Sequence, residues 1–386
     1  MGRASRGCGC AAAVLLVVIG AALFVGWKFV LPRWKQRPPP PSGSELQVHV
    51  LDVGPVNGDS ILIVSPAGKN VLIDAGDTTK AKNVVDALKR HNIQQLDYFI
   101  VTHPHPDHMG GASEVFKAVK VLNVIDNNQP PSVPPNLLPP KPATAAKGIT
   151  AKPQSTTGKK QAARPNYVTR FFDDYKDAVT KSGATYATAR PGTTYDLGGG
   201  ARLTIIAPME PPFTKENMRT GGNEANANSV VARLDYGSFS MLLTGDAEEQ
   251  TEHRLLSKEA NVEAQVLKVS HHGSKYASSA DFLQRVKPQI AIVSCGEWNR
   301  YGHPSQAVLD RLRGTNAEIK LYRTDLQGEI SITTRGRDGD VTVKTGKEST
   351  ADLWVGRIAQ KDDSSRSGFI AYGDFGPPPK PKQASK

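Results

Sequence analysis

Cysteine is scarce in this chain of 386 residues, which contains only Cys8, Cys10 and Cys295. So few cysteines exclude a scaffold held together by disulfides and a cysteine-rich zinc module. We expect no disulfide partner for Cys295, because the other two cysteines precede a long apolar run. Aromatic residues are also scarce at 6%, but the hydrophobic content of 38% is sufficient for a folded core and excludes wholesale disorder.

Acidic residues are missing from three segments. Residues 1–41 and 128–166 contain six Lys or Arg each, and residues 376–386 contain three, without any Asp or Glu. Removing these fifteen from the 48 Lys and Arg leaves 33 against 37 Asp and Glu, a net charge of −4 instead of +11. The part of the chain that can fold is therefore not basic, and net charge alone does not indicate nucleic-acid binding.

Charged residues are nearly absent from residues 11–31, where Lys28 is the single exception. A helix of this length extends roughly 31 Å, which is enough to cross a bilayer. The segment ends without the small residues of a signal-peptide cleavage site. We therefore expect an uncleaved single-pass transmembrane helix, preceded by a short flank at residues 1–10 and followed by a Pro-rich linker at residues 32–45.

From residue 46 onward, short β-rich runs alternate with turn residues and helical stretches. This pattern predicts one α/β domain of the α+β type at residues 46–345. Residues 127–166 are rich in Pro, Lys, Ala and Thr, and we expect a disordered basic insertion there. Residues 346–386 are expected to be a C-terminal extension with a Pro- and Lys-rich tail. The predicted helices include residues 80–91, 167–182 and 307–314.

Metal-binding side chains are concentrated at the end of a predicted buried strand, residues 96–102. The sequence from Thr102 onward is THPHPDH, with three histidines and one aspartate within six residues. Neutral imidazole and carboxylate are donors that zinc and manganese accept, so we expect a metal site here. The alternative is a His-rich turn that caps a helix. The candidate ligands are His103, His105, Asp107 and His108.

Two later motifs also directly follow predicted apolar strands. Asp246 follows the run LLTG, where its carboxylate is suited to bridge two metals, although it is also an ordinary helix cap. His271 and His272 follow VLKVS, and a pair of histidines in this position favours a ligand. We interpret Asp52 and Asp59 as strand-end and turn residues without a chemical role.

The order of these motifs resembles that of the metallo-β-lactamase fold. More narrowly, it resembles the hydrolase domain of the ComEC competence proteins, which take up DNA across the membrane. The resemblance covers about residues 46–335 and rests on the sequences IDAG, THPHPDH, NSVVARLDYG, LLTGD, SHHGS and NRYGHPS. It implies an αββα sandwich with a metal site at one edge.

The resemblance also implies a set of ligands: His103, His105, Asp107, His108, Asp246 and His271, with His272 as the alternative to His271. The superfamily usually supplies another histidine before the bridging aspartate, but residues 221–229 contain none. Asn226 or Asn228 is therefore expected to be a weaker oxygen donor. Asp74 and Ser274 are expected to orient the ligands through hydrogen bonds.

The implied cofactors are two divalent ions, zinc or manganese, which generate a hydroxide from bound water. Asp107 would be both ligand and proton acceptor, and His303 a general acid, unless His303 is a plain turn residue. We expect a membrane-anchored nuclease or phosphodiesterase with DNA as a possible substrate and the catalytic domain outside the cytoplasm. The alternatives are a hydrolase of the β-lactamase, lactonase or thioesterase type, or a catalytically silent metal-binding module.

Overall fold

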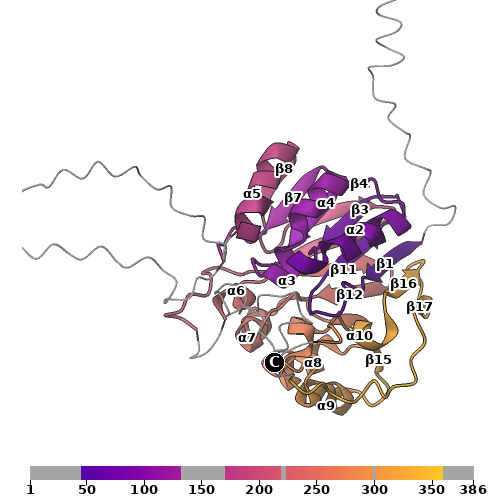
Figure 1. Cartoon of the computed structure of the whole chain (residues 1–386). Coiled ribbons are helices and arrows are strands. Elements are labelled where there is room, and N and C mark those ends of the chain that lie inside the picture. Colours follow the sequence, from indigo (N-terminus) through magenta and orange to yellow (C-terminus); the bar gives the residue numbers. More distant parts are fainter. Residues whose placement is uncertain (1–44, 132–169, 219–222, 299–300, 360–386) are drawn as a thin grey trace, which may run out of the picture. The chain divides into compact units, whose positions relative to one another are not determined.

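Two mixed β-sheets packed face to face form the centre of the fold (Figure 1). The computed structural model describes residues 45–131, 170–218, 223–298 and 301–359. All of these belong to one of the two units into which the chain divides, Ser44–Lys386.

The first sheet has eight strands, and its middle is built from the apolar runs that follow residue 45. Strands β1, β2 and β3 are antiparallel, whereas β3, β5, β7 and β8 run parallel. The order is β17 (Val341–Thr345), β16 (Ile330–Thr334), β1 (Leu46–Val50), β2 (Ile61–Val64), β3 (Asn70–Ile73), β5 (Tyr98–Val101), β7 (Asn123–Asp126) and β8 (Thr185–Thr188).

The second sheet has seven strands, of which β12 to β15 run parallel. Their order is β15 (Lys320–Arg323), β14 (Ile290–Val293), β13 (Val266–Lys268), β12 (Phe239–Leu243), β11 (Val231–Tyr236), β10 (Ala201–Ala207) and β9 (Thr194–Gly198). A separate two-stranded sheet pairs β4 (Gln95–Leu96) with β6 (Lys120–Val121).

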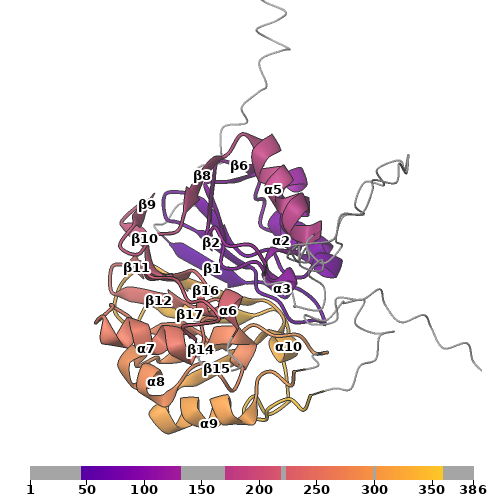
Figure 2. The ribbon, with the colours of Figure 1, turned by 90° about the vertical axis from the view of Figure 1, so that its left-hand side faces the viewer.

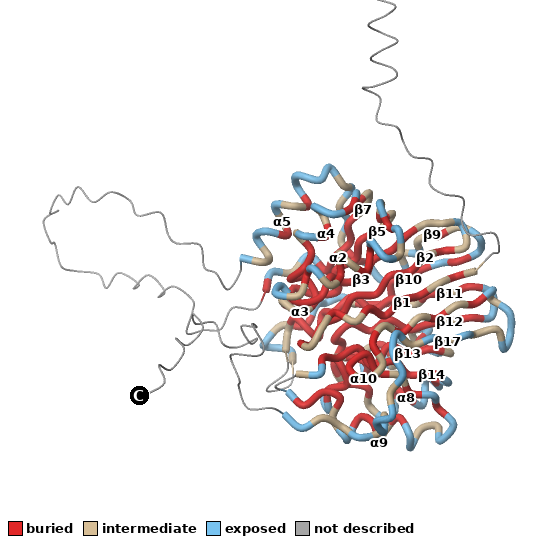
Figure 3. The backbone as a smooth tube through the Cα atoms, turned by 45° about the vertical axis from the view of Figure 1, so that its right-hand side comes forward, coloured by how far each residue is buried: buried red, intermediate tan, exposed pale blue. Residues whose placement is uncertain are grey.

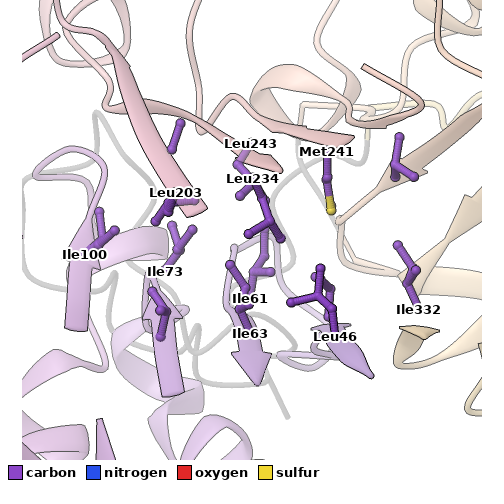
Figure 4. Packing of buried hydrophobic residues seen from close by; sticks show 14 of the residues in the cluster. Leu46, Ile61, Ile63, Ile73, Ile100, Leu203, Leu234, Met241, Leu243 and Ile332 are labelled. Carbon is purple, nitrogen blue, oxygen red and sulfur yellow. The ribbon is translucent and has the colours of Figure 1, made fainter. Parts of the chain in front are cut away.

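The main core lies between the two large sheets. In β1, alternate residues Leu46, Val48 and Val50 are buried in this core, because successive side chains of a strand point to opposite faces. Figure 4 shows Ile63 and Ile73 of the first sheet facing Leu203 and Leu234 of the second. Side chains at the other positions of these strands face the outer layers.

Helices cover the outer face of each sheet, which gives four layers in the order αββα (Figures 1 and 2). The first sheet is covered by α2 (Ala81–Arg90), α4 (Ala112–Ala118) and α5 (Arg170–Ser182), and the second by α7 (Glu249–Ser257), α8 (Ala280–Val286) and α9 (Gln306–Thr315). Short helices are η1 (Thr78–Lys80), α3 (Pro106–Met109), α6 (Glu224–Ala227), η3 (Ser270–Gly273) and α10 (Thr324–Gln327). Figure 3 shows buried residues concentrated in the two inner layers.

The predicted mixed α/β sandwich is confirmed, and three of the predicted helices correspond to α2, α5 and α9. The C-terminal extension packs onto the domain as far as it is described. The carbonyls of Leu353 and Val355 accept hydrogen bonds from the buried guanidinium of Arg323. Residue 127, expected to begin the insertion, instead belongs to the domain, because Asn127 is buried and donates to the Asn228 carbonyl.

The predicted membrane location is contradicted. In the part of the chain that the structure describes, we find no helix that is both long and apolar enough to cross a bilayer. The expected transmembrane segment, residues 11–31, lies outside the described residues, as do residues 132–169 of the expected insertion and the tail from residue 360. We therefore assign no membrane segment to the described domain.

Candidate metal centre

Histidine and aspartate side chains from both sheets meet at the edge where the parallel strands end. Asp74 follows β3, and His103 to His108 follow β5 in the first sheet. Asp246 follows β12, and His271 and His272 follow β13 in the second. Carboxyl ends of parallel strands meet at one edge of a sheet, which is a common location for functional sites in α/β folds.

The carboxylate of Asp246 lies between two groups of histidines and is buried. Its Oδ1 atom is 3.2 Å from Nε2 of His108 and 3.6 Å from Nε2 of His272. Its Oδ2 atom is 3.6 Å from Nε2 of His271 and 3.8 Å from Nε2 of His103. The sequence left His271 and His272 as alternatives, but the structure brings both to Asp246, on different oxygens.

Two sets of donor atoms have the spacing of metal ligands, with all atoms of a set within 4.8 Å of one another. One set is His103, His105 and Asp246, and the other is Asp59, His108, Asp246 and His272. Donors bound at 2.0–2.1 Å to a tetrahedral ion lie about 3.3 Å from each other. The distances of 3.2 Å from His108 Nε2 to His272 Nε2 and to Asp246 Oδ1 agree with that spacing.

Several polar atoms of these residues have no hydrogen-bond partner among the described residues. The Nε2 atom of His103 and the Oδ1 atoms of Asp59 and Asp246 are buried without a hydrogen-bond partner among the described residues. Unsatisfied polar atoms are costly in a protein interior, so their convergence on one point calls for a bound group. The residues present therefore fit divalent ions held by nitrogen and oxygen donors.

Asp74, which we expected to orient the ligands, contacts His108 directly and His103 through Thr102. Its carboxylate accepts hydrogen bonds from the backbone N–H and the hydroxyl of Thr102 and lies 2.7 Å from Nδ1 of His108. The Thr102 hydroxyl in turn lies 3.0 Å from Nδ1 of His103. With their Nδ1 atoms engaged as donors, both histidines present Nε2 to the centre, which is the usual arrangement behind metal-binding imidazoles.

The turn after β13 brings His271 and His272 to the centre through an uncommon backbone conformation. Both are left-handed, with φ of 49° and 53°, which costs about 1–2 kcal/mol per residue. Gly273 follows with φ of 84°, and a Cβ there would lie 2.6 Å from Pro304. The Nδ1 atom of His272 lies 2.9 Å from the Ser294 carbonyl, so its Nε2 faces the centre.

Asp59 is a member of the second donor set that the sequence interpretation missed. Its backbone N–H donates to the Asp107 carbonyl, and Gly58 permits this close approach, because a Cβ there would lie 2.8 Å from the same oxygen. Its Oδ2 atom is 2.7 Å from Nζ of Lys268, a fully buried lysine on β13. A lysine within the apolar run VLKVS was the sequence signal for a buried acidic partner.

Charges within the centre are strongly coupled. Burial opposes ionisation of Asp246, but His108, His272 and His271 hold its pKa well below the usual value. Burial likewise opposes the charge on His272, yet the carboxylates of Asp246 and Asp59 raise its pKa to about 10. By contrast, burial lowers the pKa of His105 to about 3. The carboxylates of the second donor set thus favour a cationic group beside them, and a metal ion can take the place of protons there.

The two predicted catalytic residues lie beside the donor sets. Asp107, in the first turn of α3, has its Oδ2 atom 3.4 Å from Nε2 of His272 and a side-chain exposure of 16%. His303 is buried with its ring centroid 5.3 Å from that of His271 and 6.4 Å from that of His272. Burial lowers the pKa of His303 well below its usual value.

The two asparagines expected as oxygen donors differ. Asn226, on α6, donates to Glu248 and lies 3.4 Å from the His271 ring nitrogens, and its Oδ1 is buried without a hydrogen-bond partner among the described residues. Asn228 does not fit, because its amide bonds the backbone of Phe213 and Glu224. Ser274 accepts a hydrogen bond from the Tyr276 backbone, so its hydroxyl shapes the turn rather than contacting a donor atom.

Known proteins are similar to this chain over parts of its length. Residues 53–191 match the Metallo-beta-lactamase superfamily. The chain is 29% identical to ComE operon protein 3 of Bacillus subtilis, over 78% of this chain and 34% of that protein. It is 28% identical to Competence protein ComA of Neisseria gonorrhoeae (84% and 37%) and to Recombination protein 2 of Haemophilus influenzae (74% and 28%). The chain thus spans about a third of the length of these relatives.

Solved structures similar to this fold include the Rm3 metallo-β-lactamase, with a TM-score of 0.34 and 16% identity over 72% of this chain and 89% of that one. Another is CmlA, a diiron β-hydroxylase from Streptomyces venezuelae, with a TM-score of 0.40 and 11% identity over 75% and 54%. The family match and the relatives confirm the resemblance predicted from the sequence. They show that the chain is similar to the metallo-β-lactamase superfamily and to ComEC-like proteins.

Proposed function

We propose that this protein hydrolyses phosphodiesters, with DNA as the foremost substrate, by means of two divalent ions of zinc or manganese. The observation that carries the proposal is the position of Asp246, whose two carboxylate oxygens face different sets of histidines. When bound, such ions lower the pKa of water toward 7 and stabilise charge on a phosphoryl group.

The ligand roles that we propose follow the two donor sets. His103, His105 and Asp246 hold one ion, with Asn226 as an additional oxygen donor and His271 beside them. The second ion is held by Asp59, His108, His272 and the other oxygen of Asp246. Asp74 and the Ser294 carbonyl keep the imidazoles of His108 and His272 in the orientation that directs Nε2 to the centre.

Asp107 and His303 have the positions required for proton transfer. Asp107 is partly exposed, so its carboxylate can reach both the second donor set and an entering water. Its role is therefore to bind the second ion or to accept a proton from that water. His303 is held neutral by burial. We therefore infer that His303 donates a hydrogen bond from its neutral ring to the leaving oxygen, in place of the full proton transfer expected from the sequence.

A phosphodiester is favoured over other ester and amide substrates by the relatives. One of them is named a competence protein and another a recombination protein. The resemblance to the ComEC competence proteins implies DNA as the substrate. The absence of a histidine from residues 221–229 separates this centre from the usual ligand set of the superfamily. The amide of Asn226, in place of that histidine, is a weaker donor on that side of the centre.

The full chain should be tested with end-labelled single-stranded and double-stranded DNA in manganese or zinc, alongside a chromogenic β-lactam and a lactone. We expect DNA cleavage that is lost with a chelator and in Asp246→Asn. His253→Gln is the matched control, because this histidine lies on α7 with 59% of its side chain exposed. Turnover of the β-lactam or lactone without DNA cleavage would favour the second class of hydrolase, and no turnover with any substrate would indicate a silent module.

A further inference from the structure

A second cluster of metal-binding side chains lies apart from the Asp246 centre and shares no residue with it. It consists of His49 on β1, His91 at the C-terminal end of α2, and Glu329, which directly precedes β16. One donor atom from each residue lies within 4.8 Å of the other two. The three residues therefore join a helix of the outer layer to two adjacent strands of the first sheet (Figure 1).

The carboxylate of Glu329 lies between the two imidazoles. Its Oε1 atom is 2.7 Å from Nε2 of His91 and 3.3 Å from Nδ1 of His49. The ring centroids of the histidines are 4.0 Å apart, with the planes inclined by 41°. Two imidazoles and one carboxylate are a donor set that zinc sites with three protein ligands use.

The lack of a hydrogen-bond partner at Nε2 of His49 among the described residues favours a metal site over a simple hydrogen-bonded group. His49 is only 6% exposed, and its Nε2 has no hydrogen-bond partner among the described residues. Its other ring nitrogen lies 2.8 Å from the hydroxyl of Ser331, the residue paired with His49 between β1 and β16. With Nδ1 held in this way, Nε2 carries the lone pair, as it does in metal-binding imidazoles.

The strand register explains why this imidazole is buried outside the main core. Leu46, Val48 and Val50 face the space between the sheets, so His49 points to the opposite face, toward the end of α2. An unsatisfied Nε2 there is unfavourable, because a buried polar atom without a partner has lost its hydration and gained no hydrogen bond. A cation bound by Nε2 removes that penalty.

The cluster is also open on one side. His91 and Glu329 line a groove of about 650 Å³ whose wall includes the carboxylates of Asp52 and Asp86. A divalent ion with three protein ligands keeps a further position for water or an added ligand, and the groove provides access to it. Arg90 also contacts Glu329, at 3.2 Å from Oε2, which leaves Oε1 directed to the histidines.

We propose that His49, His91 and Glu329 form a further divalent-metal site of the zinc type, separate from the hydrolytic centre. A ring nitrogen of His49, Nε2 of His91 and a carboxylate oxygen of Glu329 are its ligands, and Ser331 contacts Nδ1 of His49. The ion fastens the C-terminal end of α2 to β1 and β16.

Metal content of the full chain tests this site independently of hydrolysis. The proteins are dialysed to equilibrium against dilute zinc and analysed by mass spectrometry of the metal, in the Asp246→Asn background that disables the hydrolytic centre. We expect His91→Gln and Glu329→Gln, each added to this background, to contain one zinc fewer per chain, whereas His253→Gln contains the same amount. Metal bound elsewhere cancels, because each result is a difference between variants.

A second readout guards against variants that fail to fold. Cobalt added to the Asp246→Asn chain should give visible absorption bands of a nitrogen- and oxygen-bound ion, and zinc should raise its melting temperature. Both effects should be smaller in Asp246→Asn with Glu329→Gln than in Asp246→Asn alone, while the far-ultraviolet circular dichroism stays unchanged. The proposal would be overturned if folded variants that lack His91 or Glu329 gave the same results as the Asp246→Asn chain. The results to compare are the zinc content, the cobalt spectrum and the zinc-dependent shift in melting temperature.

Discussion

The ammonium nitrogen of Lys268 lies 2.7 Å from the Oδ2 atom of Asp59, and the two side chains are 0% and 2% exposed. The pair joins β13 of the second sheet to the loop before β2 of the first. Burial works against the charge on Asp59, but Lys268 and His272 hold the pKa of this carboxyl well below its usual value. Lys268 therefore keeps Asp59 ionised, and the other carboxylate oxygen of Asp59 lies 3.3 Å from Nδ1 of His272.

The first prediction concerns this ion pair. Lys268→Met should lower the free energy of unfolding by about 3–5 kcal/mol, because it leaves the Asp59 carboxylate buried without its counter-charge. The double variant with Asp59→Asn should recover part of that loss. Urea denaturation of the wild type, the two single variants and the double variant measures the coupling. Additive effects would mean that the two charges do not depend on each other.

The second prediction concerns Asp74, whose carboxylate accepts hydrogen bonds from Thr102 and faces Nδ1 of His108. In Asp74→Asn an NH₂ group replaces one carboxylate oxygen and cannot accept a hydrogen bond from Thr102 or His108. The imidazoles therefore lose their fixed orientation. We expect metal affinity to fall about 10–100-fold. Titration calorimetry measures it, with Asp97→Asn, at a site away from the centre, as a control. Unchanged affinity would remove the orienting role from Asp74.

The third prediction is a pH dependence of stability at Asp77, which caps η1 and is fully buried. Burial raises the pKa of Asp77 to about 7. Between about pH 4 and pH 7 the folded state therefore retains a proton that the unfolded state has lost, so this group's contribution to stability falls as pH rises, by up to about 1.4 kcal/mol per pH unit.

Asp77→Asn removes that contribution while keeping the hydrogen bond from the Thr79 N–H. The free energy of unfolding should therefore depend less steeply on pH in the variant than in the wild type. Urea denaturation at pH 5, 6 and 8 gives the two curves. Parallel curves for both proteins would show that Asp77 has an ordinary pKa.

The fourth prediction concerns His303. If its ring donates to the leaving oxygen, His303→Ala should reduce kcat by about 100- to 10,000-fold on substrates with poor leaving groups. The loss should be much smaller on a p-nitrophenyl phosphodiester, whose leaving group needs no hydrogen bond. Steady-state kinetics on both substrates makes the comparison. Equal losses on both would assign His303 a structural role beside His271.

The sequence could predict the histidine motif because its ligands are adjacent along the chain and end one buried strand. It could not predict Asp59, because a turn aspartate acquires a role only when Gly58 and Lys268 bring it to another sheet. It could not choose between His271 and His272, because two successive left-handed residues turn both rings inward. The prediction of Asn228 as an oxygen donor was wrong, because its side-chain amide is hydrogen-bonded to the backbone of Phe213.

The most direct test of the two-metal account is the rate of hydrolysis of bis(p-nitrophenyl) phosphate by the full chain as manganese is titrated into metal-free protein. Asp246 faces both donor sets, so the account predicts that activity rises with the second power of manganese at low concentration. In Asp246→Asn the activity should stay near zero at every concentration. A first-order rise in the wild type, or activity in Asp246→Asn that equals the wild type, would contradict the role of Asp246 as the bridge between two ions.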